Sequence, residues 1–150
     1  MADTADRATQ GLQALSPLVV KQGVSLGGLS SSERSLVFTL AWTGLPDGAL
    51  SERDVNALLK AQLAAALLFL ETDHVELRRW LVDGGWMRRD GYGREYQRTN
   101  VVQLAAADQA LAAHLAALDL QAWATGQRAA HEAHRTARRL SWQDQQGRAA

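Results

Sequence analysis

Hydrophobic residues recur every three or four positions in three successive stretches of the chain, which is the spacing of amphipathic helices. The first stretch begins at Ser30, where Glu33 completes a capping-box pattern, and residues 43–48 end it with two glycines and a proline. The second begins at Ser51 and carries its apolar stripe toward Leu70. These stretches predict two helices joined by a tight turn.

The third stretch begins beside an aspartate and ends at two glycines. Asp73 with Glu76 gives one helix-start pattern, and Thr72 is a competing cap. The pair Gly84–Gly85 ends the helix, because the left-handed residue that follows a helix is least costly as glycine. The positions predicted to face inward are Leu77, Trp80, Leu81 and Gly84.

Two short extended runs follow the third helix. The runs Trp86–Arg89 and Arg94–Arg98 flank Asp90–Gly93, a four-residue segment with two glycines. Short strands around a glycine-bearing loop predict a β-hairpin. The order helix, turn, helix, helix, hairpin is the plan of a winged helix-turn-helix, whose third helix enters the major groove while the hairpin forms a wing.

The chain before this core is less regular. Residues 1–10 are polar and are predicted to fray. Glycines and Pro17 interrupt residues 11–29, so only short elements are predicted there.

The chain after the hairpin is predicted to be helical. Leu104–Trp123 forms a long amphipathic helix, weakened at Gly126 and followed by a basic helical segment, Arg128–Leu140. Because the first of these helices carries few charges, it packs either on its own domain or on a second copy of itself. The basic segment either adds phosphate contacts or forms a solvated end, through Arg128, Arg135, Arg138 and Arg139.

The sequence therefore predicts a mainly α fold with a small β-hairpin, that is, a winged helix-turn-helix core plus a long C-terminal helix. We divide it into a partly irregular N-terminal segment, a winged-helix-like domain and a C-terminal helical extension, over residues 1–29, 30–100 and 101–150.

The formal net charge is zero, from 16 basic and 16 acidic side chains, but these charges are unevenly distributed. Residues 78–98 hold six arginines and three acidic residues, and residues 128–150 hold five arginines and two acidic residues. Neither segment contains lysine. Because guanidinium groups bind phosphates and base edges in a bidentate manner, both segments suit a nucleic-acid partner. Zero net charge excludes only binding through bulk charge.

The first arginine-rich segment coincides with the predicted reading helix and wing. A helical wheel with the apolar positions inward turns Arg79 outward and leaves the residue before it on a flank. We therefore predict duplex DNA as a partner, contacted through Arg78, Arg79, Arg88, Arg89, Tyr92, Arg94 and Arg98.

No pattern of an enzyme or a metal site is present. Cysteine is absent, which excludes disulfides, thiolate metal sites and cysteine nucleophiles. His131 and His134 are three residues apart, whereas the zinc motif HExxH needs a separation of four. We expect no catalytic residues, no metal and no cofactor. With no secretory signal and no apolar stretch long enough to span a bilayer, a cytoplasmic protein without a membrane partner is expected.

Two segments share residue types and order with a known family. They are Ser51–Lys60, reading SERDVNALLK, and Asp73–Arg98, reading DHVELRRWLVDGGWMRRDGYGREYQR. Their pattern resembles the bacterial domain-of-unknown-function family 2087, and Trp80 departs from it by replacing an acidic residue. Family members occur in or beside transcriptional regulators, so the resemblance implies a helix-turn-helix fold. The matching positions are Asp54-Val55-Asn56, Asp73, Leu77-Arg78-Arg79, Leu81-Val82-Asp83, Gly85, Arg88-Arg89 and Tyr96.

We expect a DNA-binding winged-helix protein, a small regulator that forms a homodimer through its C-terminal helix. The arginines also have local uses, because Arg79 has acidic residues in its own helix and Glu95 lies within the hairpin. The alternative is a protein-interaction or dimerisation module on the same scaffold. Val75 and Val82, on the outer side of the third helix, suit either thymine methyl groups or a protein partner.

Overall fold

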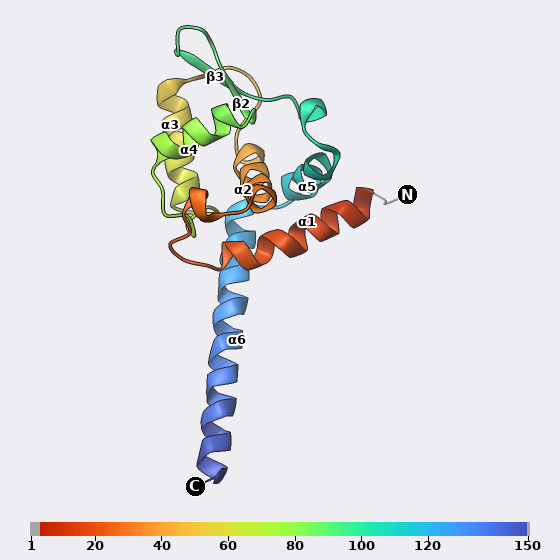
Figure 1. The fold of residues 1–150 in the computed structure, drawn as a ribbon, viewed down its shortest axis with the longest axis vertical. Coiled ribbons are helices and arrows are strands. Elements are labelled where there is room, and N and C mark those ends of the chain that lie inside the picture. The colour runs from red at the N-terminus through yellow and green to blue at the C-terminus, as the bar shows by residue number, and fades with distance from the viewer. Residues whose placement is uncertain (1–3, 150) are drawn as a thin grey trace.

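Three helices and a three-stranded antiparallel sheet form the centre of the computed structural model, which describes residues 4–149. Along the chain they follow the order helix, strand, helix, helix, hairpin, and the strands are arranged β1-β3-β2 (Figure 1). This order is consistent with a winged-helix topology and confirms the predicted fold class. The elements are α2 (Ser31–Thr43), β1 (Leu50–Ser51), α3 (Glu52–Leu63), α4 (His74–Asp83), β2 (Met87–Arg89) and β3 (Glu95–Arg98).

The predicted starts of α2, α3 and α4 and the predicted stop after α4 are confirmed. Ser30 and Glu33 form the reciprocal capping box of α2, and the Ser51 hydroxyl accepts a hydrogen bond from the third amide of α3. Of the two competing caps of α4, Asp73 is the one used, since its carboxylate accepts from the Glu76 amide at 2.8 Å. At the other end Gly85 takes a φ of 81°, as the left-handed turn after α4 requires.

Strand β1 was not predicted. It is two residues long, too short for any alternation of polar and apolar positions, and its second residue is also the cap of α3. Its register places Leu50 opposite Tyr96, so β1 pairs with the inner strand of the predicted hairpin. Strand β1 thereby ties the start of α3 to the wing.

Helix α3 ends at Leu63, and the prediction that it runs toward Leu70 was wrong. The chain instead turns over residues 64–69, which lets Leu67 and Phe69 reach the core. The backbone of residue 70 then forms a parallel bridge with Val24. The helix was predicted too long because the turns after Leu63 also bury hydrophobic residues, which continue the helical spacing of apolar positions.

The N-terminal region holds one long helix, α1 (Thr4–Val19), followed by a 3-10 turn, η1 (Leu26–Gly28). The prediction of fraying and of only short elements was therefore wrong for residues 4–19, while residues 1–3 lie outside the described part. Gly11 allows α1 to pack closely against the helix that carries Leu111, because a Cβ at this position would lie only 3.3 Å from the Leu111 side chain. Pro17 falls in the last turn of the helix, and Leu15 and Val19 are buried.

The C-terminal region contains η2 (Val101–Gln103), α5 (Ala106–Ala116) and α6 (Leu120–Ala149). Two predictions were wrong here. The expected helix Leu104–Trp123 is divided, because Asp119 begins a new helix by accepting from the Ala122 amide at 3.0 Å. The expected weak point at Gly126 does not interrupt α6.

Helix α6 is fastened near its start and then leaves the body of the molecule. The Arg128 guanidinium donates to the carbonyl oxygens of Val19, Ala65 and Ala66 at 3.3, 3.0 and 3.1 Å, and burial lowers the pKa of this group. Only Ala124 of the thirty residues in α6 is buried. Figure 1 shows the remainder as a rod whose end is far from the β2–β3 hairpin. No helix within residues 4–149 has both the length and the apolarity needed to cross a membrane.

Replacing Arg128 tests this anchor. We expect Arg128→Met to lower the free energy of unfolding by about 1.5–3 kcal/mol, the range for charge-assisted hydrogen bonds, because three carbonyl groups lose their donor. Arg135→Met is the matched control, since its pair with Glu132 spans 3.8 Å on the surface and is worth less than about 1 kcal/mol. Urea denaturation of both variants measures the difference, and equal losses would contradict the anchor.

Candidate nucleic-acid interface

Arg78 does not project toward solvent, although it was predicted to contact DNA. From α4 it donates to the Asn56 amide oxygen and forms an ion pair with Glu52 at 3.3 Å, both on α3. Its guanidinium lies 5.3 Å from the ring centre of Tyr96 on β3, and its side chain is only 14% exposed. Arg78 therefore joins two helices and the sheet, a cluster we call the Arg78 junction: Arg78, Asn56, Glu52 and Tyr96.

Arg98 is also engaged within the fold. Its Nε donates to Asp47 at 2.8 Å, its Nη1 donates to the Trp42 carbonyl at 3.1 Å, and its guanidinium lies 3.9 Å from the ring centre of Trp42. The hydrogen bond from Arg98 lowers the pKa of Asp47. The side chain is 16% exposed, so little of it is available to a partner.

The other four predicted arginines are exposed. Within the described residues, none of them has a carboxylate oxygen within 4.0 Å. One lies on α4 and the others on the hairpin that forms the wing, and we call them the free arginines: Arg79, Arg88, Arg89 and Arg94.

The loop of the wing is held by its own aspartate. The Asp90 carboxylate accepts from the Arg94 amide at 2.8 Å, and this bond lowers the pKa of Asp90. Gly93 takes a φ of 68°, which closes the loop. Tyr92, at the tip, is 87% exposed and free to stack on a partner. The Asp90 carboxylate thus shapes the loop of the wing.

The outer face of α4 carries more acidic than basic residues, which is unfavourable for a helix that approaches DNA phosphates. Arg79 shares this face with three exposed carboxylates, and the flanking Val75 and Val82 are half-buried and present less apolar surface than expected. The prediction that Gly84 faces inward was wrong, because it is exposed at the helix end. The acidic residues on the outer face are Asp73, Glu76 and Asp83.

Trp80, the departure from the family pattern, has a packing role. It is half-buried with its ring centre 6.2 Å from that of Phe38, and the Arg34 guanidinium lies 5.2 Å from the Trp80 ring. The indole therefore packs α4 on α2, where a carboxylate would have had to be desolvated.

Sequence reasoning missed the partners of both engaged arginines. It considered acids close in sequence, whereas Glu52 precedes Arg78 by 26 positions and Asp47 precedes Arg98 by 51. One signal was present, because Asn56, Arg78 and Tyr96 all belong to the pattern that carried the family resemblance. Residues that recur together across two elements are candidates for mutual contact.

Metal binding has no support in this part of the molecule. No three His, Asp or Glu side chains within residues 4–149 come together as a possible metal site. On α6, His134 is exposed and His131 is half-buried.

One family model matches residues 30–98 of the chain. Its description is "uncharacterized protein conserved in bacteria (DUF2087)". Residues 30–98 are a DUF2087 domain. This confirms the resemblance seen in the sequence. No curated protein and no solved structure matches the chain. The DUF2087 domain thus comprises α2 through β3, and the motif residues within it meet at the Arg78 junction.

Two adjacent arginines of the DUF2087 domain should differ sharply in their effect on stability. We expect Arg78→Ala to lower the free energy of unfolding by about 2–3 kcal/mol, because Asn56 and Glu52 lose their charged partner. Arg79→Ala, the matched control, should change it by less than about 0.5 kcal/mol, as exposed positions usually do. Thermal or urea denaturation measures both values. A small loss for Arg78→Ala would refute the junction.

Proposed function

We propose that the DUF2087 domain binds duplex DNA and acts as a small bacterial transcriptional regulator in the cytoplasm, with no catalytic activity. The observation that supports this proposal is the set of free arginines on the wing and α4 of a winged-helix topology. An unpaired guanidinium group on an exposed hairpin gains more free energy from binding a phosphate than a paired one does, because no internal ion pair has to be broken first.

The wing is the principal contact in this proposal. Arg88, Arg89 and Arg94 meet phosphates, and Tyr92 at the tip stacks or inserts. The carboxylates on α4 repel phosphates, so α4 does not lie along the backbone. Its base contacts are limited to Arg79 and to carboxylates that accept from cytosine N4. Arg78 and Arg98 position these elements without touching DNA.

Salt dependence tests the wing. Each neutralised phosphate contributes about 0.9 to the slope of log affinity against log salt, so the free arginines give a slope of roughly −3 to −4. Replacing Arg88, Arg89 and Arg94 together by glutamine should reduce the slope by about 3 and weaken binding strongly at low salt. Fluorescence anisotropy with a labelled duplex at several salt concentrations measures this.

The matched control for the wing variant removes the same charge from α6. Figure 1 places α6 away from the wing, so replacing Arg135, Arg138 and Arg139 by glutamine should leave the slope unchanged. The proposal fails if duplex DNA does not bind at low salt. The assignment to the wing fails if the two triple variants lose affinity equally.

A second candidate function, dimerisation, is supported by the exposure of α6. Thirty residues make a helix of about 45 Å, most of it without contact to the body. Helices that pack on nothing are marginal in water. One face has the 3-4 spacing of a helix-pairing seam, and Arg128, Arg135 and Arg139 lie on the opposite face. The seam consists of Ala130, Ala133, Ala137 and Leu140.

Pairing of α6 can be tested by mass. Light scattering should give twice the mass of the chain for the native protein, and Ala133→Glu with Ala137→Glu should give a monomer, because two buried charges would face each other. The control, Arg135→Glu with Arg139→Glu, alters the opposite face and should remain dimeric. A monomeric native protein at high concentration would rule this function out.

A further inference from the structure

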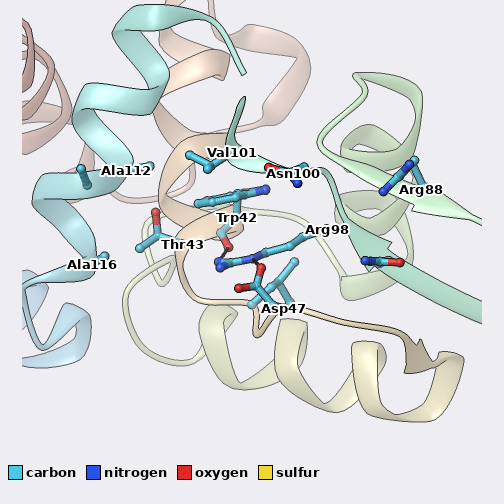
Figure 2. A pocket seen from close by; sticks show the side chains of 12 residues that line it. Trp42, Thr43, Asp47, Arg88, Arg98, Asn100, Val101, Ala112 and Ala116 are labelled. Carbon is cyan, nitrogen blue, oxygen red and sulfur yellow. Dashed lines mark hydrogen bonds and ion pairs between the residues drawn. The ribbon is translucent and has the colours of Figure 1, made fainter. Parts of the chain in front are cut away.

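A hollow lies where the DUF2087 domain meets the C-terminal helices. It opens between the end of α2, the outer face of the β2–β3 hairpin, η2 and α5, with a volume of about 590 Å³. Small-molecule sites typically fall between roughly 300 and 1,000 Å³. Figure 2 shows Trp42 and Arg98 at its centre, Arg88 on the side of the wing, and Ala112 and Ala116 on the side of α5.

The charge of this hollow favours an anion. Its charged lining residues are Asp47, Arg88 and Arg98. The first and last of these form an ion pair at 2.8 Å and neutralise each other. Arg88 has no carboxylate within 4.0 Å in the described part of the chain, so one positive charge remains. A carboxylate or phosphate group is the complement of that guanidinium.

Amide side chains add donors close to this charge. Gln97 is opposite Arg88 in the strand register, so both side chains leave the same face of the hairpin. The Asn100 oxygen accepts from the Val102 amide at 3.2 Å, which leaves the Asn100 NH₂ group free to donate. Figure 2 shows Arg88 and Asn100 on the same side of the hollow. Guanidinium and amide donors together match the oxygens of one anionic group.

The opposite wall suits a small apolar body. Ala112 and Ala116 are one turn apart on α5, and their short side chains leave the space that larger residues would fill. The Trp42 indole borders this wall but is only 5% exposed, because Arg98 lies over its ring, and its Nε1 is fixed by donating to the Thr99 carbonyl at 2.8 Å. A ligand therefore meets an apolar wall and a cationic wall at the same time.

We propose that this hollow is a binding site for a small organic anion, whose charged group pairs with Arg88 and whose apolar part lies against α5. The site goes beyond DNA binding and does not require it. Since Arg88 is one of the free arginines, an anion held there removes one phosphate contact from the wing. This competition between ligand and DNA for one side chain rests on the proposed function, whereas ligand binding itself does not.

Benzoate is a suitable probe, because it joins a carboxylate to a flat apolar ring. We expect millimolar benzoate to shift the Trp42 indole and the Asn100 and Gln97 side-chain signals of the full chain in a saturable manner in ¹H–¹⁵N NMR spectra. Benzamide lacks the charge and acetate lacks the ring, so at the same concentration and ionic strength both should bind at least tenfold more weakly. Absence of saturable shifts with benzoate, or equal binding of benzamide, would overturn the proposal.

Variants locate the site within the chain. Arg88→Gln should weaken benzoate binding about tenfold, and Ala116→Leu should block it by filling the hollow. Arg94→Gln removes an equal charge from the wing outside the hollow and should bind normally, so equal losses in the two arginine variants would overturn the assignment. No DNA is present in these titrations, so their outcome is independent of the proposed function.

Discussion

The Arg78 junction is the contact on which the arrangement of the winged-helix domain depends. A guanidinium that is mostly removed from water needs partners, and α3 supplies an amide oxygen and a carboxylate while β3 supplies an aromatic face. Because consecutive residues of a helix point about 100° apart, holding Arg78 inward sets Arg79 on the outer face of α4. One internal contact thereby decides which residue of the Arg-Arg pair is presented to solvent.

The division of the arginines changes the electrostatics that the sequence suggested. Two of the six arginines in residues 78–98 are neutralised by Glu52 and Asp47, which belong to residues 1–77, where nine acidic side chains outnumber five basic ones. Four remain, against three acidic residues in the same segment. Three of these four arginines lie on the wing, so the proposed affinity for DNA depends on the placement of a few guanidinium groups more than on net charge.

Sequence patterns of a few adjacent residues predicted most helix boundaries of the DUF2087 domain correctly. The features that they did not predict depend on packing between residues far apart in the sequence. Ser30, Ser51, Asp73 and Gly85 were read correctly because capping and left-handed turns depend on a few adjacent residues. Helix α1 was missed because Gly11 has a packing purpose that is visible only when Leu111 lies against it. The same is true of the candidate DNA-binding residues. Arg79 is exposed as its place on the helix predicted, whereas the ion-pair partners of Arg78 and Arg98 are too distant in sequence to be predicted from neighbouring residues.

The DUF2087 domain shares one hydrophobic core with helices on both sides of it in the chain. One hydrophobic core joins Leu15 of α1 and Leu115 of α5 with Leu40 and Leu81 of the domain. Trp42 strengthens this link, because its indole donates to the backbone just after β3 and its carbonyl accepts from Arg98. Trp42 thus joins the end of α2 to the base of the wing, and the hollow that it lines is closed on its other side by α5. The hollow beside Trp42 is lined by Arg88 and Arg98 of the hairpin, so the proposed ligand would contact the strands that carry the wing.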